Sequence, residues 1–509
     1  MRRATPSVIL TLLVFGMGCE GELIDRGHIV PPNEPPATPP ALALRLGDAG
    51  ADDIVDMAVD PAGNIYLTGS FSGSVDFDPG PGTAPLISLG SEDVFLAKYS
   101  PSGALLWADR IGSNDAERVT SLVSDAGGNL FIGGAFQGAA DFDPGAGTQF
   151  LTSTGGEDGF VAAYSSSGSL TWARRVGGLG ADAVLGVAVD AEGRVFATGT
   201  FTGAANTLPA PGPTLTGIGS EPDGFLLGIA ASGAIGFGVR FGGTESDLAD
   251  AVTVTTDGAI IVGGAFRGTA TFGAGATPTS LTATGGDDAF LAGFDAIGEL
   301  LWARALSGTG EQQVRAGGLA ADLDGGVVAT GSFTGTTDFD PGAGTTTRTS
   351  LGGTDWFAAR YDALGNLLSV FSVGSSASEG APRPAVDAGG AVLLTGAFAG
   401  ALDFDPGPGT RIIASLASAG ATDIYAARYS MTGALLWVSR FGEGTSVADR
   451  VNVGTAIAQA PLGGVLVAGR FFGSPDFDPD SPVYRLTSLG GDDGVVVLLT
   501  STGALALTP

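Results

Sequence analysis

The sequence has only one cysteine, Cys19, and one histidine, His28, and both lie near its start. Zinc sites with thiolate or imidazole ligands, thiol catalysis and Ser-His-Asp triads therefore lack a necessary residue in the rest of the chain. Basic residues are also scarce, because 23 Lys and Arg stand against 53 Asp and Glu, for a net charge of −30. Such a charge repels nucleic acids. Nucleic acid is therefore excluded as a partner, and any catalysis has to rest on carboxylates.

The apolar run Val8–Phe15 is too short to cross the ~30 Å hydrocarbon core of a bilayer as a helix. It follows two arginines and precedes small residues, an order typical of a secretory signal. The segment Gly16-Met17-Gly18-Cys19 resembles a bacterial lipobox, although Gly16 stands where that pattern usually has Leu. The resemblance implies lipidation of Cys19, and ordinary cleavage nearby is the alternative. We expect a signal peptide at residues 1–18 and an exported lipoprotein of the bacterial outer membrane or cell surface.

Residues 19–41 predict an extended tether between the lipidated cysteine and the folded part. Six prolines in this stretch favour a polyproline-type spacer over packed structure. They are Pro31, Pro32, Pro35, Pro36, Pro39 and Pro40. His28 lies in the same stretch, and we interpret it as a solvated linker residue.

The remaining chain consists of seven similar units. This internal repeat, and not the length of the chain, determines the predicted domain organisation. The units span about 44–110, 111–175, 176–240, 241–306, 307–373, 374–440 and 441–509. One phenylalanine recurs in every unit, as Phe71, Phe136, Phe201, Phe266, Phe333, Phe398 and Phe471. One aspartate recurs in step with it, as Asp93, Asp158, Asp223, Asp288, Asp355, Asp423 and Asp493. We expect this aspartate to cap a turn or to pair with a neighbouring unit.

Each unit reads as two β-hairpins, or four short strands. Gly63 and Gly103 of the first unit each lie between two apolar runs, where a tight turn needs the positive φ that glycine adopts. Apolar residues occupy both the odd and the even positions of the strands, so both faces of each sheet should be covered. Sheets of this kind stack radially. We therefore predict an all-β fold, a seven-bladed β-propeller of four-stranded antiparallel blades over residues 42–509, with a β-solenoid as the main alternative.

Residues 42–46 look like another copy of the outer strand at residues 105–111, whereas the last unit stops early. An N-terminal strand that completes the last blade would replace two free strand edges with one paired ladder. We expect the ring to close in this way.

The segments Val59–Gly69 and Asp93–Gly103 resemble the repeat of a family of bacterial β-propeller proteins that are exported or displayed on the cell surface. The match covers residues 44–509. The resemblance implies a propeller fold, a surface location and scaffold-like binding, and it implies no reaction.

A polar motif, Asp-Phe-Asp-Pro, occurs in five of the units and is followed by a Gly-rich turn. Its ten aspartates are Asp76, Asp78, Asp141, Asp143, Asp338, Asp340, Asp403, Asp405, Asp476 and Asp478. Two carboxylates on the same side of a strand suit a hard cation such as calcium, with backbone carbonyls as further ligands. The other interpretation is that the second aspartate hydrogen-bonds its own turn while the first faces solvent. Calcium is the one cofactor that the sequence suggests.

Units three and four lack the motif and read Asn206-Thr207-Leu208-Pro209 and Thr271-Phe272-Gly273-Ala274 instead. They form a less acidic sector, which is either a partner contact or the result of sequence drift.

The acidic residues recur in register, as structural roles produce, so the sequence favours a binding or scaffold protein without catalysis. The expected partner is a protein or polysaccharide of the cell surface. The alternative is a carboxylate-based carbohydrate-active enzyme that uses the central funnel. Such an enzyme should have a deep pocket with two unlike acids that depart from the repeat register.

Overall fold

The computed structural model describes the following residues of one compact unit, Thr38–Pro509: 42–208, 212–273, 278–417, 421–443, 450–461, 463–478 and 483–506. Every regular element in these ranges is a β-strand. None of the described segments forms a helix of the length and apolarity needed to cross a membrane.

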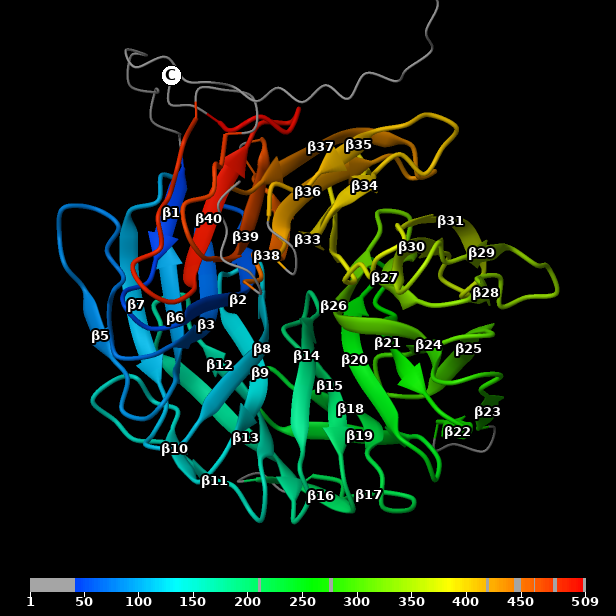
Figure 1. The fold of residues 1–509 in the computed structure, drawn as a ribbon. Helices are drawn as coiled ribbons and strands as arrows, with labels where there is room; N and C mark the ends of the chain where they lie inside the picture. The colour runs from blue at the N-terminus through cyan, green and yellow to red at the C-terminus, as the bar shows by residue number, and fades with distance from the viewer. Residues whose placement is uncertain are drawn as a thin grey trace, which may run out of the picture. The chain divides into compact units, whose positions relative to one another are not determined.

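Seven antiparallel four-stranded sheets surround a common centre, and Figure 1 shows β2, β8, β14, β20, β26 and β38 innermost. The first four blades contain β2 (Asp52–Val59), β3 (Ile65–Phe71), β6 (Asp93–Tyr99) and β7 (Leu105–Ile111); β8 (Glu117–Ser124), β9 (Leu130–Phe136), β12 (Asp158–Tyr164) and β13 (Leu170–Gly178); β14 (Ala183–Val189), β15 (Val195–Phe201), β18 (Asp223–Ile229) and β19 (Ile235–Phe241); and β20 (Asp247–Val254), β21 (Ile260–Phe266), β24 (Asp288–Phe294) and β25 (Leu300–Gly308). The last three contain β26 (Gln312–Ala321), β27 (Val327–Phe333), β30 (Asp355–Tyr361) and β31 (Leu367–Val373); β32 (Arg383–Val386), β33 (Val392–Phe398), β36 (Asp423–Tyr429) and β37 (Leu435–Phe441); and β38 (Val453–Gln459), β39 (Val465–Phe471), β40 (Asp493–Leu499) and β1 (Ala43–Leu46). The predicted seven-bladed propeller is confirmed.

Between the second and third strands of a blade, the chain forms a small additional hairpin that the sequence interpretation had taken for a turn. We call these the flap hairpins. They are β4 (Ser74–Asp76) with β5 (Pro85–Ile87), β10 (Ala139–Asp141) with β11 (Phe150–Thr152), β16 (Ala204–Leu208) with β17 (Leu215–Thr216), β22 (Thr269–Phe272) with β23 (Thr279–Thr282), β28 (Thr336–Asp338) with β29 (Thr347–Thr349), and β34 (Ala401–Asp403) with β35 (Ile412–Ala414). The strands β16 and β28 also pair with β13 and β25, the outer strands of the preceding blades. A flap therefore joins its own blade to the one before it.

The predicted hairpin turns are confirmed at the recurring glycines. Gly63 joins β2 to β3 with φ 84° and Gly103 joins β6 to β7 with φ 83°. Both angles lie in the left-handed region that side chains disfavour.

The core is a set of aromatic clusters between neighbouring sheets. In the first blade the ring of Phe77, from the Asp-Phe-Asp-Pro motif, lies 5.6 Å from Phe71 and 4.9 Å from Phe95, measured between centroids. Strands such as β9, β12 and β21 are buried at every position. The prediction that both faces of the sheets are covered is therefore confirmed, and the motif phenylalanine is part of that core.

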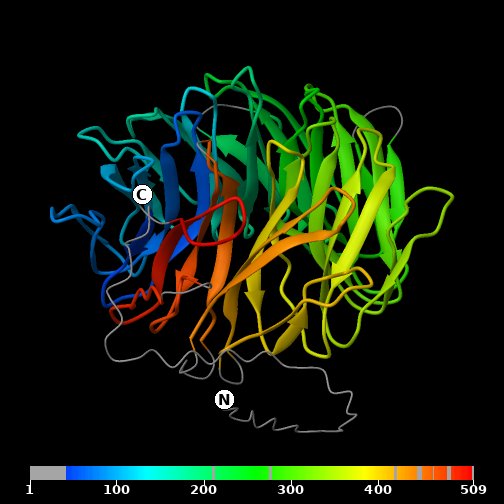
Figure 2. The same ribbon diagram turned by 90° about the horizontal axis from the view of Figure 1, so that it is seen from above.

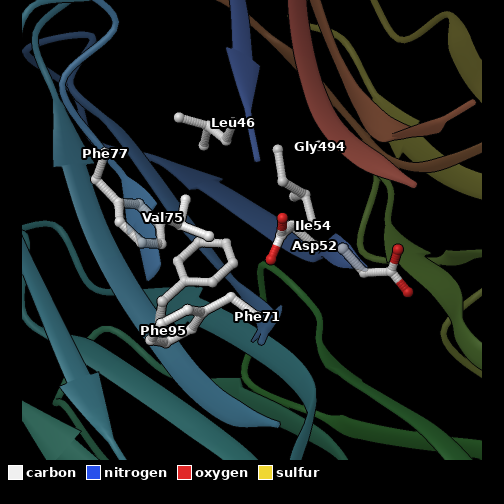
Figure 3. A pocket seen from close by; sticks show the side chains of 9 residues that line it. Leu46, Asp52, Ile54, Phe71, Val75, Phe77, Phe95 and Gly494 are labelled. Atoms are coloured by element: carbon white, nitrogen blue, oxygen red, sulfur yellow. The ribbon is translucent and has the colours of Figure 1, made fainter. Parts of the chain in front are cut away.

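The ring closes through the first described strand. β1 pairs antiparallel with β40, with Leu44 opposite Val496, and Figure 2 shows the blue N-terminal strands beside the red C-terminal ones. Arg45 forms an ion pair with Asp493 at 2.7 Å within the completed blade. The gap between this blade and the first, shown in Figure 3, is too narrow to hold a water molecule. The predicted closure by an N-terminal strand is confirmed.

The recurring aspartate caps a turn at every junction between blades. Its Oδ2 accepts a backbone N–H from a residue shortly before it, as Leu89 donates to Asp93 at 3.0 Å. The seven members, Asp93, Asp158, Asp223, Asp288, Asp355, Asp423 and Asp493, are each 2% exposed or less. The expected turn cap is thus confirmed.

A second polar series, which the sequence interpretation missed, stands at the start of the next blade. It consists of Asp52, Glu117, Asp182, Asp247, Gln312, Glu379 and Asn452, and all seven are buried. A Cβ on Gly112 would lie 2.8 Å from both Asp93 Cγ and Glu117 Oε2. Glycine at that position therefore lets two carboxyl groups approach each other in the interior.

Burial raises the pKa of these carboxyl groups, and the neighbouring carboxylate adds to the effect. The pKa of Glu117 rises to about 7, mainly by burial and further by Asp93. The pKa of Asp247 also rises to about 7 through burial and the charge of Asp223. An acid whose pKa is raised on folding stabilises the fold fully below its unfolded pKa, and this contribution is lost as the pH rises through the folded value. The junctions therefore favour mildly acidic conditions.

Removal of β1 should destabilise the ring. A chain that starts at residue 48 lacks Leu42, Leu44 and Leu46, all of which are at least 96% buried. Each buried leucine is worth about 1.5–3 kcal/mol. We expect the Tm, measured by calorimetry, to fall by on the order of 10 °C relative to a chain that starts at residue 42. Equal Tm values would contradict closure by β1.

Stability should decrease between pH 5 and pH 8, and Asp247→Asn should flatten that dependence. One unit of pKa shift corresponds to about 1.4 kcal/mol. The measurement is the free energy of unfolding in denaturant at a series of pH values. The control is Glu92→Gln, which removes one exposed charge. The same slope in wild type and Asp247→Asn would show that the junction carboxyls do not titrate as described.

Candidate binding site in the central channel

The seven innermost strands enclose a cavity of about 260 Å³ on the axis of the ring. One apolar residue from each blade lines it at the same register position. These residues are Met57, Leu122, Val187, Val252, Leu319, Pro384 and Ile457. An apolar residue thus recurs at this position in every blade, as at the core positions.

The residue directly before each of these positions does not repeat. From the first blade to the seventh it is Asp56, Ser121, Gly186, Ala251, Gly318, Arg383 and Ala456. Asp56 in β2 and Arg383 in β32 are the two charged members, and both line the cavity. The two charged residues of the channel lining therefore occupy a position at which the sequence does not follow the repeat.

Asp56 is held by backbone donors. Its Oδ2 accepts the N–H of Leu122 in the second blade at 2.8 Å, and its Oδ1 accepts the N–H of Met57 at 2.9 Å. Ser121 has the corresponding role one blade further, because its Oγ accepts the N–H of Val187 at 3.3 Å. Burial raises the pKa of Asp56, while Arg383 and the two backbone donors lower it. Asp56 thus links two blades.

Arg383 lacks such fixed partners. The guanidinium of Arg383 forms no direct hydrogen bond or ion pair with any described residue, although the charges of Asp56 and Asp250 act on it. Burial lowers the pKa of its guanidinium, and these two carboxyl groups partly offset that effect. The guanidinium lies where a side chain on Gly317 would have to be. The glycine therefore makes room for Arg383 in the channel.

The fifth blade departs from the repeat beside Arg383. In β26 the register shifts between Val314 and Leu319, whereas the shift in β2 lies between Ile54 and Asp56. The longer bulge contains Arg315, which is exposed, and Gly317. This departure from the repeat places Gly317 in the lining of the channel.

Asp250 in β20 lies outside the cavity lining, but its charge acts on Arg383. It is 7% exposed, and within the described part of the chain its carboxyl group makes no direct hydrogen bond or ion pair. Its pKa rises to about 6, because burial outweighs the opposing charges of Arg315 and Arg383. The sequence interpretation missed all four charged residues, Asp56, Asp250, Arg315 and Arg383, although their departure from the repeat was a usable signal.

The Asp-Phe-Asp-Pro aspartates lie at the flap hairpins, and each pair remains within its own flap. Asp76 Oδ1 accepts the N–H of Asp78 at 3.0 Å and of Ala84 at 2.7 Å. Asp78 Oδ1 accepts the N–H of Gly80 at 2.8 Å. The same bonds recur at Asp141 with Asp143, at Asp338 with Asp340 and at Asp403 with Asp405, and Asp476 again accepts two backbone N–H groups.

The bond from Gly80 to Asp78 is the one that the turn interpretation requires, whereas Asp76, which that interpretation left facing solvent, also accepts two backbone N–H groups. Tyr99 also donates its hydroxyl hydrogen to the carbonyl of Phe77 at 2.9 Å, which engages one backbone oxygen of the turn. Within the described ranges, no three His, Cys, Asp or Glu residues gather as a metal site would need. Calcium at Asp76, Asp78 and their counterparts stays a prediction. Cys19, the predicted lipidation site, lies outside the described residues.

A family model described as "Beta-propeller repeat" matches residues 43–70. This chain is built from β-propeller repeats. It is 24% identical over 412 residues to "Uncharacterized WD repeat-containing protein L264" of Acanthamoeba polyphaga mimivirus, with 68% of this chain and 29% of that protein covered. It is 24% identical over 460 residues to "Regulatory protein FlaEY" of Caulobacter vibrioides, with 87% and 45% covered. The β-propeller chain thus spans less than half the length of these curated relatives.

Two solved structures are similar at a low level. A protein of unknown function from Bacteroides caccae has a TM-score of 0.27 and 9% identity, over 59% of this chain and 78% of that one. Rhamnogalacturonan lyase YesW has a TM-score of 0.26 and 13% identity, over 90% of each chain. At such scores nothing about activity carries over to the β-propeller chain.

The substitution Asp78→Ala distinguishes the two interpretations of the flap motif. If Asp78 only caps its turn, the variant loses about 1 kcal/mol of stability, and the loss is the same in calcium as in chelator. We expect this result from thermal unfolding in the two buffers. A calcium-dependent rise of the wild-type Tm that shrinks in Asp78→Ala would instead establish a bound ion, since a ligand of the native state raises its stability.

Proposed function

We propose that this protein is a lipid-anchored β-propeller of a bacterial envelope that binds a surface partner and does not catalyse a reaction. One observation carries the proposal: departures from the repeat in blades one, five and six place Asp56, Gly317 and Arg383 in the lining of the central channel. The side chain of Arg383 has no direct partner among the described residues, although the charges of Asp56 and Asp250 act on it. A partly buried charge without a partner is unfavourable for stability, so its presence supports a role in binding.

The anchoring part of the proposal rests on the sequence. Two arginines, the apolar run Val8–Phe15 and the lipobox-like segment that ends at Cys19 precede a proline-rich stretch. Such a tether would hold the ring at a distance from the membrane. The partner that this location offers is a protein or a polysaccharide of the cell surface.

A carbohydrate-active enzyme is the second candidate, because two carboxyl groups outside the repeat register, Asp56 in the channel lining and Asp250, act on Arg383 of the channel. Burial raises the pKa of both Asp56 and Asp250, and that of Asp250 reaches about 6. Glycoside cleavage needs an acid and a base or nucleophile that both reach the substrate. Both oxygens of Asp56 already accept backbone N–H groups. This engagement favours binding over catalysis.

The proposed anchor predicts that Cys19→Ala moves the protein from the membrane fraction to the soluble fraction of cells. Metabolic labelling with a fatty acid should mark the wild type and not the variant. A variant that is still found with membranes and still labelled would contradict lipidation at Cys19.

The proposed channel site predicts that Arg383→Gln weakens the capture of envelope components from an extract by at least tenfold. Arg348→Gln is the matched control, since Arg348 lies on the flap strand β29. Equal capture by wild type and Arg383→Gln would show that the partner binds elsewhere. Cleavage of an envelope polysaccharide that Asp250→Asn abolishes would favour the enzyme.

A further inference from the structure

We propose that the central channel binds a small hydroxylated carboxylate, whose carboxylate group pairs with Arg383 and whose hydroxyl groups donate to Thr253 and Thr455. This inference rests on the proposed binding function and specifies the chemistry of the ligand.

The guanidinium of Arg383 is the reason for a carboxylate. A guanidinium presents a planar fork of N–H donors that matches a carboxylate with two parallel hydrogen bonds. Arg383 lines the cavity, and none of the described residues satisfies its donors directly. Gly317 leaves open the space that the guanidinium occupies. The donors are thus available to a ligand, and the backbone around them is shaped to keep them so.

The hydroxyls of Thr253 and Thr455, which line the cavity, are the reason for hydroxyl groups. Thr455 Oγ1 donates to the carbonyl of Ile54 at 2.7 Å, so its oxygen is left to accept. A ligand that pairs with the arginine can therefore donate a hydroxyl hydrogen to these two side chains.

Charge and size limit the ligand to one carboxylate on a small molecule. The chain has a net charge of −30, which repels a polyanion at a distance. The guanidinium of Arg383 is a local exception to that field, and the carboxylate of Asp56 in the same cavity opposes a second anionic group on the ligand. The cavity of about 260 Å³ lies just below the range of about 300–1,000 Å³ that ligand pockets occupy. A single sugar acid has the appropriate size, and the apolar ring of Met57, Leu122 and their counterparts can pack against its carbon skeleton.

Titration calorimetry with D-glucuronate tests the inference. Glucose, which lacks the carboxylate, and acetate, which lacks the hydroxyls, are the ligand controls. We expect saturable one-to-one binding of glucuronate and at least tenfold weaker binding of both controls. Arg383→Gln should weaken glucuronate binding at least tenfold and Thr253→Val several-fold, while Arg348→Gln should leave it unchanged. Thermal unfolding of each variant checks that it is folded.

The outcomes separate the ligand chemistry from the binding role. If glucuronate does not bind, or binds Arg383→Gln as well as wild type, the inference is wrong. If, in addition, capture of envelope components still depends on Arg383, the channel remains a binding site for another chemistry. If that capture is also independent of Arg383, the proposed channel site fails with it. Equal binding of glucose and glucuronate would remove the carboxylate from the proposal.

Discussion

The pairing of β1 with β40 is the constraint on which the rest of the structure depends. Each sheet buries both faces against its neighbours, so an open arc of blades would leave two apolar faces in water. Leu44 opposite Val496 and the ion pair of Arg45 with Asp493 complete the last blade with a strand from the other end of the chain. Only in the closed ring do the seven inner strands enclose a channel, and the candidate site exists because of that closure.

Repetition explains most of the acidic residues. The aspartates of the Asp93 series hold turns at the blade junctions, and those of the flap motif accept backbone N–H groups within their own hairpins. Their roles are the same in each blade where they occur, as expected of residues that build the ring. Asp56 and Arg383 differ because the other blades carry no charge at their position and because both line the channel, where one ligand can contact several blades at once.

The sequence alone predicted the blade count, the hairpin glycines and the closing strand, because each depends on local or periodic signals such as Gly63 between two apolar runs. It did not reveal the flap hairpins, since the pairing of β16 with β13 joins residues of different repeats. The second junction series was hidden because Asp52, Glu117, Gln312 and Asn452 differ in residue type while they occupy the same place. The channel cluster was missed because its members are far apart in the sequence, and each one alone resembles drift.

The central claim is that residues in register with the repeat maintain the ring, whereas Thr253 and Arg383 in the channel lining serve binding. The most direct measurement determines, for single substitutions in both groups, the free energy of unfolding and the affinity for one ligand of the channel. The account predicts that Asp93→Asn and Asp223→Asn change mainly stability. It predicts that Thr253→Val and Arg383→Gln change mainly affinity. Loss of affinity at the junction aspartates with unchanged binding in the channel variants would contradict it.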